Sequence, residues 1–374
     1  MFDYNIPYLL LILAFLLLSL LERKEIVGKS KIRFFSGLFF FIFFGTRGLI
    51  GSDWYNYMYY FDNTSFSDIK IVEDFELGFS FLTKFLKLIG FNYNYYVLFI
   101  TLIQTILFDN IIRKYSVNIS LTYALFVCLF PLLIIDALRN LLSILIACQA
   151  LPYIEQKKNR KAILIIVTSM FFHTTGVFFF LLFPFSKNYI RQPYILILLV
   201  IGTFIYFFQL RFFDILIESL GGVFGGRIDY LSKSVTKSDQ SYGITFGIVE
   251  KYFFAYLLLK NFDVIKKTKI LTPVFFNLFF IYIFIYLFFS TSESFINRFS
   301  LLFFIFYIVG IVNCIFVLKL YKQRIILNAV ILLIFIKTFL TFNNILYDYS
   351  TFIYKKDDIN KRETDRFNYY RERE

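Results

Sequence analysis

Residues 6–50 decide the class of fold. Residues 6–21 read IPYLLLILAFLLLSLL, the loop 22–33 reads ERKEIVGKSKIR, and residues 34–50 read FFSGLFFFIFFGTRGLI. A helix that crosses a bilayer needs about 17–25 mainly apolar residues, and both apolar runs approach that length. The first run has no basic segment before it and no small-residue cleavage site after it. It therefore predicts a retained membrane anchor rather than a cleaved signal peptide.

The composition extends this prediction to the whole chain. Of the 374 residues, 59% are hydrophobic and 22% are aromatic, and the mean hydropathy is +0.68. A soluble protein of this size has no interior large enough for so much apolar surface, so the bilayer is the expected solvent. The net charge of +13 resides mostly in short loops, which indicates membrane orientation rather than nucleic-acid binding.

Ten apolar runs predict an all-α, polytopic transmembrane helical bundle. They cover residues 6–21, 34–50, 95–112, 119–135, 137–154, 193–210, 244–259, 271–290, 299–318 and 325–342. No internal repeat or low-complexity linker divides them. We therefore expect a single transmembrane domain over residues 1–342, followed by a polar C-terminal tail over 343–374.

Short loops rich in lysine and arginine predict the orientation. They are residues 22–33, 113–118, 155–161, 260–270 and 319–324. Because such loops stay on the cytoplasmic side, the N-terminus, the tail and two larger loops, 51–94 and 211–243, are expected outside. Within the first outer loop, segment 79–89 carries Lys84 and Lys87 in an apolar helical pattern, which predicts an amphipathic helix on the membrane surface.

The apolar stretch 162–185 conflicts with this orientation if it crosses the membrane once, because loop 260–270 would then lie outside. A re-entrant hairpin with residues 173–176 at its tip keeps every basic loop inside. Broken backbone is tolerated within a membrane where protein or a watery cavity shields it. One long tilted helix is the alternative.

Charged residues stand at the expected outer ends of the spans. Charge within a membrane is costly and usually faces a cavity or a partner. Arg47 ends the second span, and Gly51, Asp53 and Tyr57 follow it. The Arg47 guanidinium can donate two parallel hydrogen bonds to a phosphate, and Asp53 can accept a proton or orient a sugar hydroxyl. A surface ion pair between Arg47 and Asp53 is the simpler alternative.

Three further sites are expected at the same level. Asp136 and Arg139 stand at the start of the fifth span, where an internal pair closing a turn is the simpler alternative. Glu293 and Arg298 stand between two late spans, where snorkelling would also explain them. The single histidine, His173, is the side chain best suited to accept a proton near neutral pH, although a hydrogen-bonded packing role is equally open. Together the arginines suit an anionic group such as a diphosphate.

No metal or cofactor is expected. Cys128, Cys148 and Cys314 each lie within an apolar run, and none belongs to a CxxC pair. This spacing is not that of a zinc site or of a disulfide framework.

Arg47, Gly51, Asp53 and Tyr57 resemble the R-x-x-x-G-x-D-x-x-x-Y element of a known family, the EpsG-like, Wzy-type polysaccharide polymerases. Residues 76–79, ELGF, are similar to the E-x-G-F element that follows it.

The later elements keep the order of the family. Arg139 heads a helix as in the family's R-Q-x-x-A run, although Asn140 stands in place of the usual Gln and the small residue is displaced. Phe172 and His173 resemble the family's F-H pair, and Arg298 resembles its late arginine.

Over residues 47–298 the resemblance implies an inverting membrane glycosyltransferase with a GT-C-like helical architecture. Its substrates would be undecaprenyl-diphosphate-linked oligosaccharides. It would join their repeat units into an O-antigen, capsule or exopolysaccharide on the outer (periplasmic or extracellular) side of the bacterial plasma membrane, with a flippase and a chain-length regulator as partners.

The same resemblance, with the chemistry above, suggests a role for each residue. The expected bases are His173 and Asp53. The expected diphosphate ligands are Arg47, Arg139 and Arg298. The expected supporting residues are Gly51, Tyr57, Glu76, Asp136 and Glu293.

Two alternatives share the need for cations around a diphosphate. A flippase or transporter of lipid-linked oligosaccharide should carry charges near the midplane and on both sides, in two related halves, and neither feature is evident in the sequence. An O-antigen ligase would use the same chemistry with another acceptor, and the sequence does not separate it from a polymerase. The step from fold to function is analogy here.

Overall fold

The computed structural model describes residues 4–65, 75–210, 245, 247–292, 296, 298–354 and 357–371. In this part of the chain every regular element is a helix, apart from an isolated β-bridge between Arg47 and Thr351. The predicted all-α class is therefore confirmed. The helices form two compact units. Unit 1 comprises residues 1–182 and 320–374, and unit 2 comprises residues 183–319.

Several helices have the composition of membrane spans. Among the described residues, four are long and apolar enough to cross a bilayer: α1 (Ile6–Arg23), α5 (Tyr93–Tyr115), η2 with α19 (Ser300–Val317) and α20 (Leu320–Phe342). Shorter apolar helices include α6 (Ile119–Leu129), α12 (Gln192–Phe208) and α17 (Pro273–Phe288). These helices support the predicted membrane protein. The count of about ten spans and the GT-C-like architecture stay predictions.

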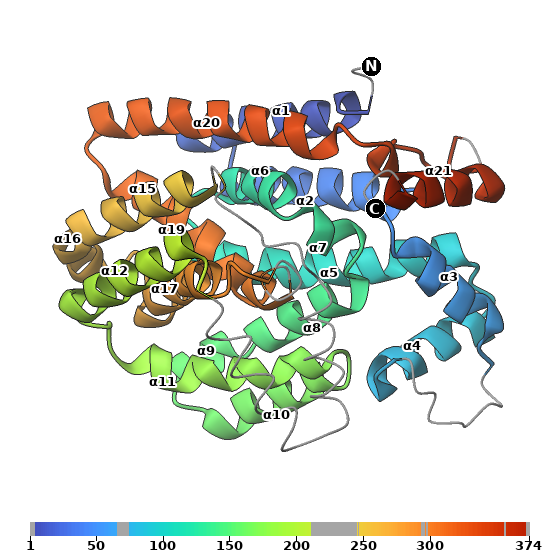
Figure 1. Ribbon diagram of the computed structural model, residues 1–374, viewed down its shortest axis with the longest axis horizontal. Coiled ribbons are helices and arrows are strands. Elements are labelled where there is room, and N and C mark those ends of the chain that lie inside the picture. The colour runs from blue at the N-terminus through green and yellow to red at the C-terminus, as the bar shows by residue number, and fades with distance from the viewer. Residues whose placement is uncertain are drawn as a thin grey trace. The chain divides into compact units, whose positions relative to one another are not determined.

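Unit 1 is built on α1, α2 (Lys29–Gly45), α5, α6 and α20. α1 packs against α2, α6 and α20, and α2 packs against α5 (Figure 1). On α1 the side chains of Tyr8, Ile12 and Phe15 are fully buried, whereas Leu10 and Leu17 are more than half exposed. The buried positions recur every three or four residues, so one face of the helix meets the bundle and the other is left for lipid.

Proline divides two predicted spans into shorter helices. The run 119–135 forms α6 and then α7 (Pro131–Ile135). The run 137–154 forms α8 (Leu138–Cys148) and then α9 (Leu151–Glu155). Pro131 and Pro152 occupy first turns, where the missing amide hydrogen is not needed for the helix ladder.

The stretch 162–185 is broken in the middle rather than one long helix. α10 (Asn159–Met170) ends before a turn at residues 171–173, and the 3₁₀ helix η1 (Thr174–Leu181) then packs back against α10. α11 (Leu182–Lys187) continues from η1. The predicted hairpin shape, with His173 at its tip, is therefore present, while its re-entry into the membrane stays a prediction.

Contacts place four of the five basic loops together at one end of unit 1. Arg23 donates to Gln323 at 3.5 Å, Lys114 forms a 2.6 Å ion pair with Glu155, and the Ile119 amide donates to Glu22 at 3.2 Å, which links the two pairs. These residues belong to four of the five basic loops or adjoin them. The other end of α5 lies about 34 Å away at 1.5 Å per residue. This length supports the prediction that the basic loops and the outer residues lie at opposite ends of the helices.

The opposite end of unit 1 carries two short helices, α3 (Trp54–Asn63) and α4 (Leu77–Leu88). α4 buries Phe79, Thr83 and Leu86 and exposes Phe81 and Leu88. It is thus an amphipathic helix as predicted, and its position on the membrane surface stays a prediction.

The C-terminal tail is folded onto this same end of unit 1. It contains η3 (Ile345–Tyr347) and α21 (Ile359–Arg371). The Gly48 amide donates to the Ser350 carbonyl at 2.9 Å, and the Gly51 amide donates to the Leu346 carbonyl at 2.8 Å. The tail therefore lies on the same side as residues 48–51, as the predicted orientation requires.

Unit 2 packs α17 against α12 and α19, with α15 (Gly247–Lys260) and α16 (Phe262–Thr268) beside α19. Two charged residues of α15 are covered by tyrosines. The Lys251 ammonium lies 3.9 Å from the ring centroid of Tyr286, and the Tyr307 hydroxyl donates to Glu250 at 2.9 Å. The predicted outer loop 211–243 lies outside the described residues.

Candidate functional site

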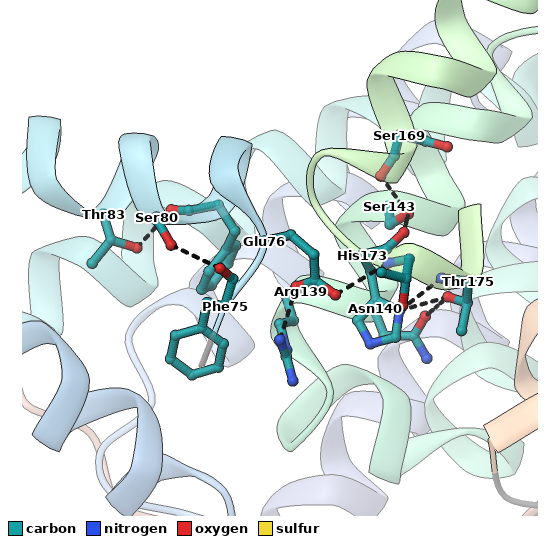
Figure 2. Close-up of polar contacts among 12 residues, drawn as sticks. Phe75, Glu76, Ser80, Thr83, Arg139, Asn140, Ser143, Ser169, His173 and Thr175 are labelled. Atoms are coloured by element: carbon teal, nitrogen blue, oxygen red, sulfur yellow. Dashed lines mark hydrogen bonds and ion pairs between the residues drawn. The ribbon is translucent and has the colours of Figure 1, made fainter. Parts of the chain in front are cut away.

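Glu76 joins two separate elements of unit 1. One carboxylate oxygen lies 2.8 Å from the Arg139 guanidinium, and the other accepts the Thr174 amide at 3.1 Å (Figure 2). Glu76 precedes α4, Arg139 lies in the first turn of α8, and Thr174 begins η1. The side chains of Arg139 and Glu76 are only 26% and 16% exposed, so water screens the pair less than at an open surface.

The start of α4 rests directly on the hairpin tip. The amides of Gly78 and Phe79 donate to the Phe171 carbonyl at 2.8 and 3.2 Å. A Cβ atom at Gly78 would lie 2.9 Å from that carbonyl oxygen, so only glycine permits the approach. This contact explains the spacing of residues 76–79, because the Glu76 carboxylate and these two amides hold adjacent parts of one tip.

Arg139 is also fixed on its flat face. Its guanidinium carbon lies 4.5 Å from the ring centroid of Phe75, which is a cation–π distance. Phe75 in turn stacks on Tyr57, with 5.7 Å between centroids. Burial raises the pKa of the Tyr57 hydroxyl, so Tyr57 is neutral at ordinary pH and supports Arg139 through Phe75.

The His173 ring belongs to a chain of hydrogen bonds. His173 Nδ1 lies 2.6 Å from Thr175 Oγ1, and that hydroxyl donates to Asn140 Oδ1 at 3.0 Å. In the tautomer in which the Thr175 hydroxyl donates to Asn140 and accepts from Nδ1, Nδ1 carries the ring hydrogen and Nε2 carries the basic lone pair. The longer contact from the Thr175 amide to Nδ1, 3.3 Å, belongs to the other tautomer. The Ser143 hydroxyl donates to the carbonyls of Ser169 and His173 and so fixes the backbone on both sides of the turn at residues 171–173.

Asp136 organises the loop after Arg47. Its Oδ1 accepts the amides of Ser52 and Asp53 at 2.5 and 3.0 Å. Gly51 has φ +86°, and a Cβ atom there would lie 2.3 Å from the same oxygen. Burial raises the pKa of the Asp136 carboxyl to about 6, against the effect of these amide hydrogen bonds. Gly51, Asp53 and Asp136 thus form one loop structure.

Arg47 lies inside the bundle, with only 4% of its surface exposed. Its guanidinium donates to the carbonyls of Phe44 and Ile135 and to the Thr101 hydroxyl, at 2.5, 3.4 and 3.3 Å. These acceptors come from the end of α2, from α7 and from α5. Arg47 therefore joins three helices at the end of the bundle that carries the site.

The two remaining predicted residues lie elsewhere. Arg298 belongs to unit 2 and is exposed, while Glu293 lies outside the described residues. The convergence of Arg298 with Arg47 and Arg139 stays a prediction. Within the described ranges, no group of three His, Cys, Asp or Glu residues is placed to hold a metal ion.

Sequence reasoning missed several residues that the structure brings into the site. They are Phe75, Ser143, Ser169, Thr174 and Thr175, and the role of Asn140 as an acceptor in the histidine chain. Asn140 follows Arg139 directly, and the two threonines follow His173. Their adjacency to predicted residues is the signal that could have found them.

These features define a polytopic helical membrane protein with a partly buried Glu–Arg pair and a hydrogen-bonded histidine at one end of its first unit. Residues 31–355 of the chain match the EpsG family. The match covers most of the chain, so the protein belongs to the EpsG family of polysaccharide polymerases, which indicates a role in polysaccharide biosynthesis. No curated protein and no solved structure matches the chain.

Proposed function

We propose that this protein is a membrane glycosyltransferase that polymerises oligosaccharide repeat units carried on undecaprenyl diphosphate, on the outer side of the bacterial plasma membrane. A hydroxyl of the incoming unit attacks the anomeric carbon of the growing glycan. The bond from that carbon to the carrier diphosphate breaks, the diphosphate leaves with the electron pair, and the hydroxyl proton passes to a base. The product is a surface polysaccharide such as O-antigen, capsule or exopolysaccharide.

One observation carries this proposal: in a member of the EpsG family, Glu76 holds Arg139 and the His173 tip at one end of unit 1. The reaction needs cationic charge on the departing diphosphate and a base near the attacking hydroxyl. Glu76 contacts Arg139 and the amide of Thr174, which follows His173, and these contacts support Arg139 and His173 as candidates for the two roles.

Arg139 is the proposed ligand of the leaving diphosphate. Its guanidinium is held on one edge by Glu76 and on one face by Phe75, and about a quarter of its surface stays exposed. A cation fixed before the reaction stabilises developing negative charge without reorganising. Arg298 is the proposed second ligand. The burial of Arg47 favours a positioning role for that residue.

His173 is the proposed base, acting through Nε2. In the tautomer whose Nδ1 hydrogen is donated to the Thr175 hydroxyl, Nε2 carries the basic lone pair. A positioned base typically contributes about 10²- to 10⁴-fold to the rate. Asp53 is the rival base, in the loop organised by Asp136.

The test uses a strain that lacks the gene, complemented with variants. Arg139→Ala, Arg298→Ala and His173→Gln should leave single repeat units on the surface glycan and remove polymer, at normal protein abundance. Arg324→Ala, an exposed arginine of a predicted basic loop, is the matched control and should polymerise normally.

The glycan of the uncomplemented strain separates this function from its alternative. Single repeats on the surface support a polymerase. A complete absence of surface glycan would instead identify a flippase, and the proposal would then be wrong. If Asp53→Asn removes polymer and His173→Gln does not, Asp53 is the base.

A further inference from the structure

A cavity of ≈ 240 Å³ lies in unit 1, beside α3. It is formed by α3, by the start of α5 and by the C-terminal tail. The lining residues that matter here are Met58, Asp62, Tyr93, Asn94, Phe352 and Asp357.

The wall supplied by the tail is firmly built. One oxygen of the Asp357 carboxylate accepts the Leu49 amide and the Ser350 hydroxyl, each at 2.7 Å. The other oxygen accepts two guanidinium hydrogens of Arg362 at 3.2 Å. A Cβ atom at Gly48 would lie 2.0 Å from the Asp357 carboxylate, so the glycine lets the tail close against the loop. The cavity is therefore a feature of the packed tail and not an accident of a loose terminus.

α3 connects the cavity to the candidate site. Met58 and Asp62 are four residues apart and share one face of this helix, whereas Tyr57 supports Arg139 through Phe75. Asp62 lies about 13 Å along the helix axis from Asp53, at 1.5 Å per residue. Tyr93 packs on the same apolar cluster as Phe75. One helix, α3, thus carries both residues of the cavity lining and, through Tyr57 and Phe75, the support of Arg139.

The lining has the chemistry of a sugar subsite. A sugar ring presents apolar C–H faces and a rim of hydroxyl groups. Tyr93, Phe352 and Met58 supply apolar surface for the faces. The Asp62 carboxylate accepts hydroxyl hydrogens, and the Asn94 amide can both donate and accept. A phosphate would meet the carboxylates of Asp62 and Asp357, and a lipid chain would leave these polar groups unsatisfied.

We infer that this cavity binds a sugar residue of the lipid-linked oligosaccharide, at a position away from the bond being formed. The inference rests on the proposed function for the identity of the oligosaccharide. The cavity then holds the glycan while Arg139 and His173 act at its reducing end, and the tail is part of the substrate-binding wall.

The test measures binding of the lipid-linked repeat unit, extracted from cells that lack the gene, to purified full-length protein in nanodiscs by native mass spectrometry. Loss of one hydrogen bond to a sugar hydroxyl should weaken binding about five- to tenfold. Asp62→Ala and Asn94→Ala should each raise the Kd by that factor, and Asp62→Asn should recover part of the loss. Asn63→Ala is the matched control, because Asn63 is exposed and bonds only its own helix carbonyl at Tyr59 among the contacts described.

The outcomes separate the two proposals when the same samples are assayed for polymer. If the wild type polymerises and Asp62→Ala and Asn94→Ala bind within twofold of it, the sugar subsite is wrong and the proposed function stands. In a second outcome, the wild type binds the repeat unit, both variants bind it more weakly, and the wild type forms no polymer. The subsite then stands and the proposed function is wrong. If the wild type does not bind the repeat unit, both are wrong.

Discussion

Glu76 and Arg139 are separated by 63 residues in the chain and by 2.8 Å in the fold. The same Glu76 carboxylate accepts the amide of Thr174, beside the single histidine. A change at Glu76 therefore reaches both the proposed diphosphate ligand and the proposed base.

Glu76→Ala should reduce polymer formation about 100-fold or more, because displacement of catalytic groups by about 1 Å can cost that factor. Glu76→Gln should retain more activity, since its amide oxygen can still accept one of the two hydrogen bonds. The measurement is polymer formed per unit of protein in complemented cells. Glu363→Ala, an exposed glutamate of α21, is the control and should be unaffected.

A double-mutant cycle tests whether Glu76 acts through Arg139. Because the two residues are in contact, the effects of Glu76→Ala and Arg139→Ala on activity should not add, and the coupling free energy should be about 1–3 kcal/mol. Additive effects would show that the ion pair has no part in the activity.

Thr175→Val should lower activity about 10- to 100-fold, because it removes the hydroxyl that contacts His173 Nδ1 while nearly keeping the side-chain volume. Thr175→Ser keeps the hydroxyl and should restore most of the activity. The readout is the pH–rate profile of polymerisation with purified protein. A profile of Thr175→Val that matches the wild type in height and shape would exclude the hydrogen-bond chain from catalysis.

The sequence predicted the apolar helices better than it predicted the site. Long apolar runs such as residues 6–21 form helices whatever surrounds them, whereas the division of 119–135 depends on Pro131. The pairing of Glu76 with Arg139 could not be predicted, because it depends on where α4 and α8 meet in three dimensions. The folding of the tail onto Gly48 was missed for a similar reason: its contacts are backbone hydrogen bonds and a buried carboxylate, which leave no apolar pattern.

Three glycine substitutions separate backbone strain from steric overlap. Gly28→Ala should be nearly neutral, because a Cβ atom there meets nothing within 4 Å. Gly90 has φ +91° and open space, so Gly90→Ala should cost only the strain of about 1–2 kcal/mol. Gly51→Ala adds an overlap with the Asp136 carboxylate at 2.3 Å and should cost more than Gly90→Ala. Melting temperatures in detergent should fall in that order, and equal values for Gly51→Ala and Gly90→Ala would contradict the tight loop.

Asp136 predicts a pH dependence of stability. The pKa of its carboxyl is raised from 3.8 to about 6, chiefly by burial and in part by the nearby Asp53 charge, while the amide hydrogen bonds and Arg47 act in the opposite direction. A raised pKa favours the protonated folded state, so this contribution is present below about pH 4 and is lost as pH rises through 6. It amounts to at most about 3 kcal/mol. Asp136→Asn keeps the accepting oxygen but does not titrate, so the wild type should lose melting temperature relative to this variant between pH 5 and pH 7.5. A constant difference would contradict the raised pKa.

The packed tail makes a prediction about membrane sidedness. Tyr354 of the tail and Tyr59 of α3 are 92% and 64% exposed, and Ile26 of the first basic loop is 64% exposed. The three native cysteines are buried, so single cysteine substitutions can be labelled against a low background. Because Ser350 and Leu346 bond the loop at residues 48–51, Tyr354→Cys and Tyr59→Cys should react with a membrane-impermeant maleimide from the same side. The basic-loop rule puts that side outside, so both should label in intact spheroplasts and Ile26→Cys only after permeabilisation.

Two results would contradict this sidedness. Labelling of Ile26→Cys alone in intact spheroplasts would show that the orientation is the reverse and that the proposed active face is cytoplasmic. Labelling of Tyr59→Cys and Tyr354→Cys from different sides would instead contradict the packing of the tail, and with it the cavity wall that Asp357 forms.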